Sequence, residues 1–228
     1  MFPFYFDSTM IFLIPAILLS LYAQSKIKSA YNIYSREGLE SRLNGAEVAR
    51  RVLDQAGLYD VAIERIGGNL TDHYDPRTKV LRLSQDVYDK ATIASAGVAA
   101  HEAGHAIQDD QEYAPLKLRG FMVPLASIGS QFSMIIIIGG LIFGITGLMD
   151  VGIILFSLVV LFQLITLPVE FNASSRALAV LGDTQILTMS EVPKAKKVLD
   201  AAALTYVAAA FSSIMTLVRL LVLRGRRD

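Results

Sequence analysis

The chain has 228 residues, and its 21 lysines and arginines balance its 21 aspartates and glutamates, so the formal net charge is zero. This balance excludes a nucleic-acid partner held by bulk positive charge. Hydrophobic residues make up 53% of the chain, more than a soluble domain of this length usually carries, and they gather in a few long runs. The chain has no cysteine, which excludes disulfides and thiolate ligands. The composition therefore predicts a membrane protein whose metal sites, if present, use histidine and carboxylate.

The first apolar run extends from about Thr9 to Ala23 and predicts a membrane anchor. A secretory signal is the alternative, but the positive charges of Lys26 and Lys28 follow the run instead of preceding it, and no small-residue cleavage site follows. We therefore expect residues 1–24 to be a retained N-terminal anchor.

Residues 25–119 have the composition of a soluble domain, because they hold thirteen of the 21 lysines and arginines together with a normal share of acids. Asn44 and Glu47 form a capping-box pattern at the start of an amphipathic helix. Short apolar stretches separated by turn residues follow between residues 61 and 83. They predict a small antiparallel sheet.

A long helical pattern, from about Thr92 to Asp109, carries the motif His101-Glu102-Ala103-Gly104-His105. Residues four apart on a helix point in nearly the same direction, so both imidazoles can reach one metal ion. The Glu102 carboxylate can then approach a metal-bound water and act as general base. The alternative is a packing helix that carries two histidines by coincidence, but the chain has only three histidines and two of them have this spacing. The motif predicts a zinc hydrolase.

Two uncharged apolar runs, residues 121–147 and 151–169, predict a transmembrane hairpin with a short turn around Asp150. Gly140 and Gly144 form a pair of small residues four apart, which would allow close contact between helices. We expect the hairpin to occupy residues 120–169.

Residues 170–198 are predicted to form a helix that opens with Glu170 and continues into a polar linker, and residues 199–228 an apolar helix with a basic tail. If the soluble parts are cytoplasmic, as their lysine and arginine content indicates, a fourth span would place this tail outside, against the positive-inside tendency. The last helix therefore either spans with a disfavoured end or lies at the interface. We expect a mainly α, multi-pass cell-membrane protein with three or four transmembrane helices and a cytoplasmic site.

The two motif histidines leave the predicted site one short of the three protein ligands that catalytic zinc normally has. In a chain without cysteine, the third ligand is His73 or a carboxylate. Glu170 is the better choice, because the two crossings of the hairpin return the chain to the side of the motif just before this residue. The alternative is an interfacial glutamate favoured by the dipole of a helix N-terminus.

Two further polar side chains are candidates for catalysis. His73 lies in a predicted edge strand, where it can donate to the transition state or contact a substrate strand, or be only a surface histidine near a turn. Arg176 follows Glu170 by six residues and is compatible with a role near a developing oxyanion, with a carboxylate partner or with a solvated charge.

The assembled pattern resembles the YugP-like family of membrane zinc metallopeptidases over nearly the whole chain. The order of the pieces is similar to that of HtpX-type membrane proteases. This resemblance implies a zincin-like soluble domain and a gluzincin-like site, with one zinc ion on His101, His105 and Glu170. Glu102 is then the base. HtpX-type proteins carry an aspartate four residues after the third ligand, whereas this chain has Ser174, so that role is not transferred. The matching pieces are LTDHYDPRTKVLRLS at 70–84, GVAAHEAGHAIQ at 97–108, LPVEFNASSRA at 167–177 and VLDAAALTYVAAA at 198–210.

We therefore expect a zinc endopeptidase that is anchored in the lipid bilayer, has its site beside the bilayer on the cytoplasmic side, and cuts membrane-associated or misfolded polypeptides by attack of a zinc-activated water. The alternative is a non-catalytic membrane scaffold stabilised by zinc. Glu102 argues against the scaffold, because a structural zinc site has a fourth protein ligand in place of an open position.

Overall fold

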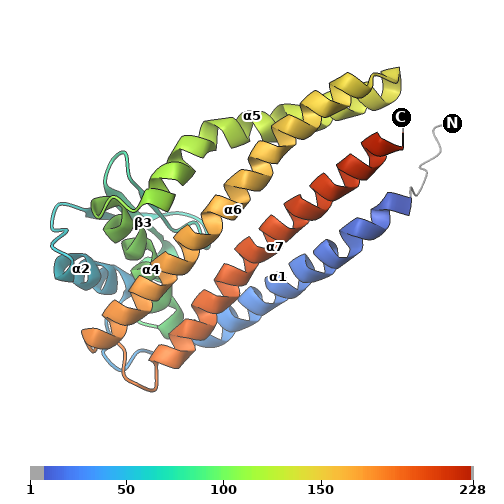
Figure 1. Ribbon diagram of the computed structural model, residues 1–228. Coiled ribbons are helices and arrows are strands. Elements are labelled where there is room, and N and C mark those ends of the chain that lie inside the picture. Colours follow the sequence, from blue (N-terminus) through green and yellow to red (C-terminus); the bar gives the residue numbers. More distant parts are fainter. Residues whose placement is uncertain (1–7, 227–228) are drawn as a thin grey trace. The chain divides into compact units, whose positions relative to one another are not determined.

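The computed structural model describes residues 8–226 and is shown in Figure 1. The first seven residues of the predicted anchor and the last two of the basic tail lie outside the described residues. The chain divides into two units, of which the first comprises Met1–Gln24, Leu118–Leu167 and Thr205–Asp228, and the second Ser25–Lys117 and Pro168–Leu204. The elements are η1 (Ser8–Leu13), α1 (Ile14–Tyr34), α2 (Gly45–Gln55), β1 (Ala62–Ile66), β2 (His73–Asp75), β3 (Val80–Ser84), α3 (Gln85–Asp89), α4 (Ile93–Asp110), α5 (Ala114–Phe143), α6 (Thr146–Asp183) and α7 (Val192–Gly225).

Four helical segments of the described chain are long and apolar enough to cross a membrane, namely η1 with α1, α5, α6 and α7. Large apolar side chains such as Ile135, Ile142 and Ile154 remain exposed on these helices, as lipid surroundings require. The protein is therefore a mainly α membrane protein. By length and composition, α7 qualifies as the fourth span that the sequence left open.

Polar contacts within the first unit join its helices at the end that carries the basic tail. Arg224 Nε donates to Asp150 Oδ1 at 2.8 Å, and Arg226 Nη2 donates to Ser8 Oγ at 3.0 Å. The carboxylate of Asp150 thus offsets one positive charge of the tail.

The hairpin of α5 and α6 turns earlier than the sequence predicts. Gly144, with a φ of 70°, forms the turn between these helices, and the predicted turn around Asp150 lies inside α6. The prediction that Gly144 belongs to a helix contact is therefore wrong, because nothing lies within 4 Å of a Cβ added there. Gly140 does allow a close contact, since its added Cβ would lie 2.9 Å from Met149 N.

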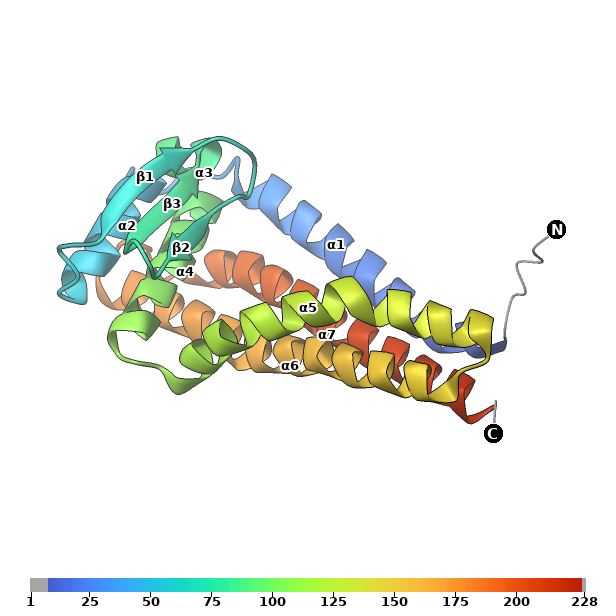
Figure 2. The ribbon, with the colours of Figure 1, turned by 90° about the horizontal axis from the view of Figure 1, so that it is seen from above.

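The second unit contains a three-stranded sheet in which β3 lies between β1 and β2 (Figure 2). β3 pairs antiparallel with β2 but parallel with β1, so the prediction of an antiparallel sheet is wrong for the β1–β3 pair. The physical reason lies in burial and loop length. β3 is the most buried strand and takes the central place, and the six residues 67–72 carry the chain past it instead of closing a hairpin.

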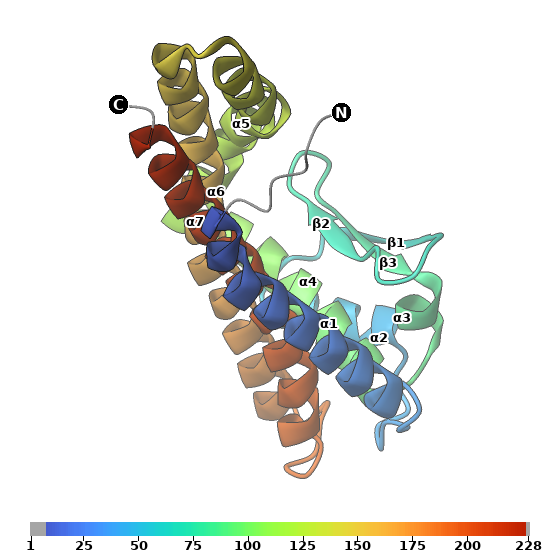
Figure 3. The same cartoon turned by 90° about the vertical axis from the view of Figure 1, so that its right-hand side faces the viewer.

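Helices α2, α3 and α4 cover one face of this sheet (Figure 3). Their core includes Leu53 of α2, Leu81 of β3 and Ile93 of α4, and it continues to Leu181 in the part of α6 that belongs to the same unit. The predicted capping box of α2 is confirmed. The side chain of the N-cap residue Asn44 accepts a hydrogen bond from Glu47 N, and the side chain of Glu47 accepts one from Asn44 N. The sheet and α2 thus support α4, which carries the histidine motif.

Gly129 of α5 generates a stability prediction for the hairpin, because a Cβ added there would lie 2.5 Å from Leu155 O in α6. Close packing is the main force between helices in lipid. Gly129→Ala should therefore lower the free energy of unfolding by about 1–3 kcal/mol. Thermal unfolding of the purified protein in detergent measures the loss. Gly120→Ala on the same helix is the control, since nothing lies within 4 Å of its added Cβ; equal losses in the two variants would contradict the prediction.

Candidate metal centre

Helices α4 and α6 bring three side chains of metal-ligand type together. They are His101 and His105 of α4 and Glu170 of α6, and their ligand atoms all lie within 4.8 Å of one another. His101 Nε2 lies 3.3 Å from Glu170 Oε2, and His105 Nε2 lies 3.7 Å from the same oxygen. The three residues that the sequence predicted as zinc ligands therefore converge within the second unit.

The convergence depends on a close approach of the two helices at Gly104. A Cβ added to Gly104 would lie 2.8 Å from Ala173 O and 3.3 Å from Ala173 Cα, so any larger residue would push α6 away. Ala100 and Ala103, on the same stretch of α4, are fully buried. The small residues around the two histidines thus allow the carboxylate of the neighbouring helix to reach them.

Glu170 lies inside α6 and does not begin a helix, so the prediction of a helix start at this residue is wrong. Pro168 precedes it within the same continuous helix. A proline removes only one backbone hydrogen bond, and such a loss is tolerated in membrane helices. The alternative explanation of Glu170, a helix N-terminus that favours negative charge, therefore does not apply.

The donor set fits a zinc ion. Zinc takes imidazole nitrogen and carboxylate oxygen at about 2.0–2.2 Å, which places two ligands of a tetrahedral ion roughly 3.4 Å apart. The two nitrogen–oxygen distances of 3.3 and 3.7 Å are close to this value. Burial opposes the charged form of His105, but the carboxylates of Glu170 and Glu102 outweigh it and raise the pKa of His105. The centre therefore attracts a cation.

The remaining ring nitrogen of each motif histidine also has a protein contact. His101 Nδ1 lies 3.1 Å from Ser174 Oγ, and His105 Nδ1 lies 3.0 Å from Gln108 Oε1. No role was predicted from the sequence for Gln108 or for Ser174. Helical spacing could have indicated both residues as neighbours of predicted ligands, because Gln108 follows His105 by three residues and Ser174 follows Glu170 by four.

Glu102 is partly exposed, and within residues 8–226 no hydrogen bond reaches its carboxylate. Its negative charge nevertheless acts on its surroundings. Burial raises the pKa of Asp72, two hydrogen bonds from Ser84 oppose this rise, and the charge of Glu102 adds to it. The charge of Glu102 also raises the pKa of His105. Its carboxylate is therefore close to the metal ligands and available to water.

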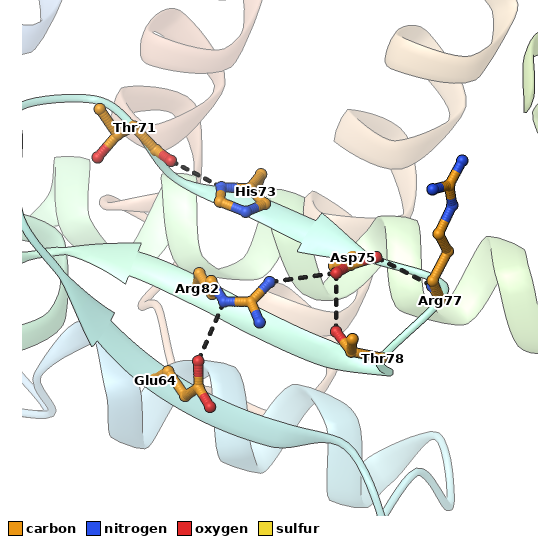
Figure 4. A network of polar contacts seen from close by, with 7 residues as sticks. All are labelled: Glu64, Thr71, His73, Asp75, Arg77, Thr78 and Arg82. Atoms are coloured by element: carbon orange, nitrogen blue, oxygen red, sulfur yellow. Dashed lines mark hydrogen bonds and ion pairs between the residues drawn. The ribbon is translucent and has the colours of Figure 1, made fainter. Parts of the chain in front are cut away.

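His73 lies on the outer face of the sheet. It is paired in register with Arg82 of β3, whose guanidinium donates to Glu64 of β1 at 3.0 Å (Figure 4). Leu81, next to Arg82, belongs to the core, and successive strand residues point to opposite faces. His73 therefore faces away from α4, with its Nδ1 2.9 Å from Thr71 O. The structure does not bring it to the three ligands.

Arg176 lies further along α6 and contacts polar and aromatic side chains of the second unit. Its Nε donates to Asn172 Oδ1 at 2.7 Å, its Nη1 donates to Gln111 Oε1 at 2.6 Å, and its guanidinium lies 6.0 Å from the centre of the Tyr113 ring. None of these partners is a carboxylate. Arg176 therefore ties α6 to the C-terminal end of α4 and the turn that follows.

The position of Glu170 predicts what its substitution does to metal binding. Glu170→Ala should lose zinc, and Glu170→Asp should bind it much more weakly, because the side chain becomes shorter by about 1.5 Å while the bond to zinc needs roughly 2.0–2.2 Å. His73→Ala is the matched control and should keep the metal. Elemental analysis and competition with a chromophoric chelator measure the zinc content and Kd. Wild-type affinity in Glu170→Ala would refute the assignment.

Comparisons with known proteins show the family of the chain. A family model described as "Putative neutral zinc metallopeptidase" matches residues 9–225. The chain is also 48% identical over 217 residues, which are 94% of this chain and 96% of the relative, to "Putative membrane protease YugP" of Bacillus subtilis (strain 168). No solved structure matches the chain. Because the family match covers nearly the whole chain, including both helices that carry the three converging side chains, the chain belongs to this family of neutral zinc metallopeptidases.

Proposed function

We propose that the protein is a membrane-anchored zinc endopeptidase of the gluzincin type, which hydrolyses peptide bonds of membrane-associated or misfolded polypeptides. The observation that carries the proposal is the convergence of His101, His105 and Glu170 beside the accessible carboxylate of Glu102. The names of the family and of the bacterial relative support the protease class and the membrane location. The three converging side chains support one zinc ion per chain.

In this proposal, His101, His105 and Glu170 would hold a zinc ion, and the bound ion would supply Lewis-acid chemistry that polarises a scissile carbonyl and lowers the pKa of a water molecule. Glu102 accepts the proton of the attacking water at its carboxylate and later donates it to the leaving amine. This exchange needs a carboxylate that is not committed to other donors, and no hydrogen bond reaches Glu102 in the described part of the chain. His101, His105 and Glu170 hold the ion, and their side chains are mostly buried, which excludes bulk water from their side of the site.

His73 and Arg176 have supporting roles in this proposal. β2, which carries His73, is an edge strand, and an extended polypeptide can pair with the free edge of a sheet. Arg176 strengthens the contact between α6 and the end of α4 through Asn172 and Gln111. Neither residue holds the metal.

A zinc-stabilised scaffold without activity is the second candidate and is less well supported. A structural zinc site is closed by four protein ligands. The cluster found among residues 8–226 has three, which leaves a position for water and substrate. In the part of the chain that the structure describes, Glu102 also makes no side-chain hydrogen bond that would indicate a structural role.

Glu102→Gln tests the mechanism. The amide cannot accept the proton, so turnover of a fluorescent unfolded protein in detergent should fall by about 10²- to 10⁴-fold. Zinc content should stay close to that of the wild type, because no ligand is removed. Glu112→Gln is the control, since Glu112 is an exposed partner of Lys117 at 3.0 Å, and should retain activity. Substantial peptidase activity in Glu102→Gln would rule out its role as base.

We also propose that the site faces the cytoplasm, because residues 25–119 hold thirteen lysines and arginines and the positive-inside tendency keeps such segments inside. The chain has no cysteine, so single cysteines report accessibility without background. Tyr59→Cys, at an exposed site of the second unit, should resist a membrane-impermeant maleimide in intact cells and react after lysis. Ile145→Cys, in the α5–α6 turn, should react in intact cells. The reverse pattern would place the site outside.

A further inference from the structure

Gln108 is a fully buried amide at the contact between α4 and α6. Its Nε2 donates to Val169 O and to Asn172 Oδ1, both at 2.9 Å, and its Oε1 lies 3.0 Å from His105 Nδ1. Both of its N–H groups and its oxygen are therefore engaged by protein. Gln108 thus connects His105, a predicted metal ligand on α4, with Val169 on α6. Val169 directly precedes Glu170, another predicted ligand.

The partners of this amide determine which way it points. The nitrogen and oxygen of a glutamine amide are similar in shape, so their assignment has to follow from what surrounds them. Val169 O is a backbone carbonyl and can only accept, so it must face the NH₂ group of Gln108.

A second constraint leads to the same orientation. The guanidinium of Arg176 has donors only, and its Nε lies 2.7 Å from the side chain of Asn172, so the Asn172 atom at this point is the oxygen. This oxygen also faces Gln108 at 2.9 Å and requires a donor there. A backbone carbonyl and an arginine, independent of each other, thus both place Nε2 of Gln108 away from the histidine.

The orientation of Gln108 then determines the proton position on His105. The amide oxygen can only accept, so His105 Nδ1 must carry a hydrogen. A neutral imidazole has one N–H, which leaves the lone pair on Nε2. Nε2 is the nitrogen that lies 3.7 Å from Glu170 Oε2.

His101 has no comparable constraint. Its Nδ1 lies 3.1 Å from Ser174 Oγ, and a hydroxyl group can donate or accept by rotating. The contact therefore orients the His101 ring without selecting a tautomer. The two motif histidines, although they share one helix face, are held in different ways.

We propose that Gln108 is a positioning residue of the metal centre: it holds His105 in the Nδ1–H tautomer and so presents the lone pair of Nε2 to the metal ion. The inference rests on the proposed function for the identity of the metal, whereas the tautomer itself follows from the protein alone. Partners of this kind, which bind the far side of a ligand, typically change metal affinity by about 10- to 100-fold when they are removed.

The tautomer is measurable by nitrogen NMR on metal-free protein with isotope-labelled histidine, at a pH where the imidazoles are neutral. The chain has only three histidines, and His73→Gln removes the one outside the centre. A His101→Gln spectrum assigns the remaining signals. We expect His105 as the Nδ1–H form in the wild-type centre and a mixture of both tautomers in Gln108→Met.

Zinc affinity provides the second readout. Gln108→Met should raise the Kd for zinc by about 10- to 100-fold. Gln131→Met is the matched control, because Gln131 is an exposed glutamine of α5 whose amide contacts Ser127 Oγ at 3.3 Å, and it should leave the Kd unchanged.

An Nε2–H form of His105 in the wild-type centre would overturn the proposal, and this measurement needs no substitution at position 108 and therefore no stable variant. A folded Gln108→Met protein with the wild-type tautomer and the wild-type Kd would also overturn it. The test separates the two levels of inference. A wild-type protein that binds no zinc but shows the Nδ1–H form refutes the proposed function alone, and one that binds zinc without this form refutes the role of Gln108 alone.

Discussion

The approach of α6 to α4 at Gly104 is the contact on which the site depends. An added Cβ at Gly104 would lie 2.8 Å from the backbone of Ala173, so the distance between these helices leaves no space for a side chain there. This distance lets Glu170 reach both motif histidines and lets Gln108 bind the backbone of Val169. A change of one methyl group at this point would act on all three interactions together.

The same contact buries the carboxylate of Glu170, which has an electrostatic cost. The residue is 2% exposed, and a carboxylate removed from water costs on the order of several kcal/mol unless positive charge compensates it. Two imidazoles face it. Burial by itself would lower the pKa of His105, but the nearby carboxylates outweigh this effect and raise that pKa. In the proposed zinc site, a divalent cation would satisfy the same requirement more completely than protons do.

The sequence by itself determined the features that depend on short spacing and on composition. The helical repeat places His101 and His105 on one face, and the capping box of Asn44 and Glu47 is closed by residues three apart. The long apolar runs required spans, because an unpaired backbone in lipid is too costly to be anything but helical. The position of Glu170 beside the two histidines was also predictable, since a hairpin of two crossings returns the chain to the motif.

Only the tertiary structure decided the features that depend on contacts between distant residues. The register of β2 against β3 places His73 opposite Arg82 on the outer face, and the parallel pairing of β1 with β3 likewise follows from no local pattern of residues 61–83. The helix α6 continues through Pro168, although a proline usually predicts a helix start or break, because the loss of one backbone hydrogen bond is tolerated in membrane helices. Gln108 is oriented by the backbone of Val169, 61 residues away in the chain, and Ser174 contacts His101, 73 residues away. Helical spacing shows which residues share a face of one helix. Their hydrogen-bond partners depend on which other helix packs against that face.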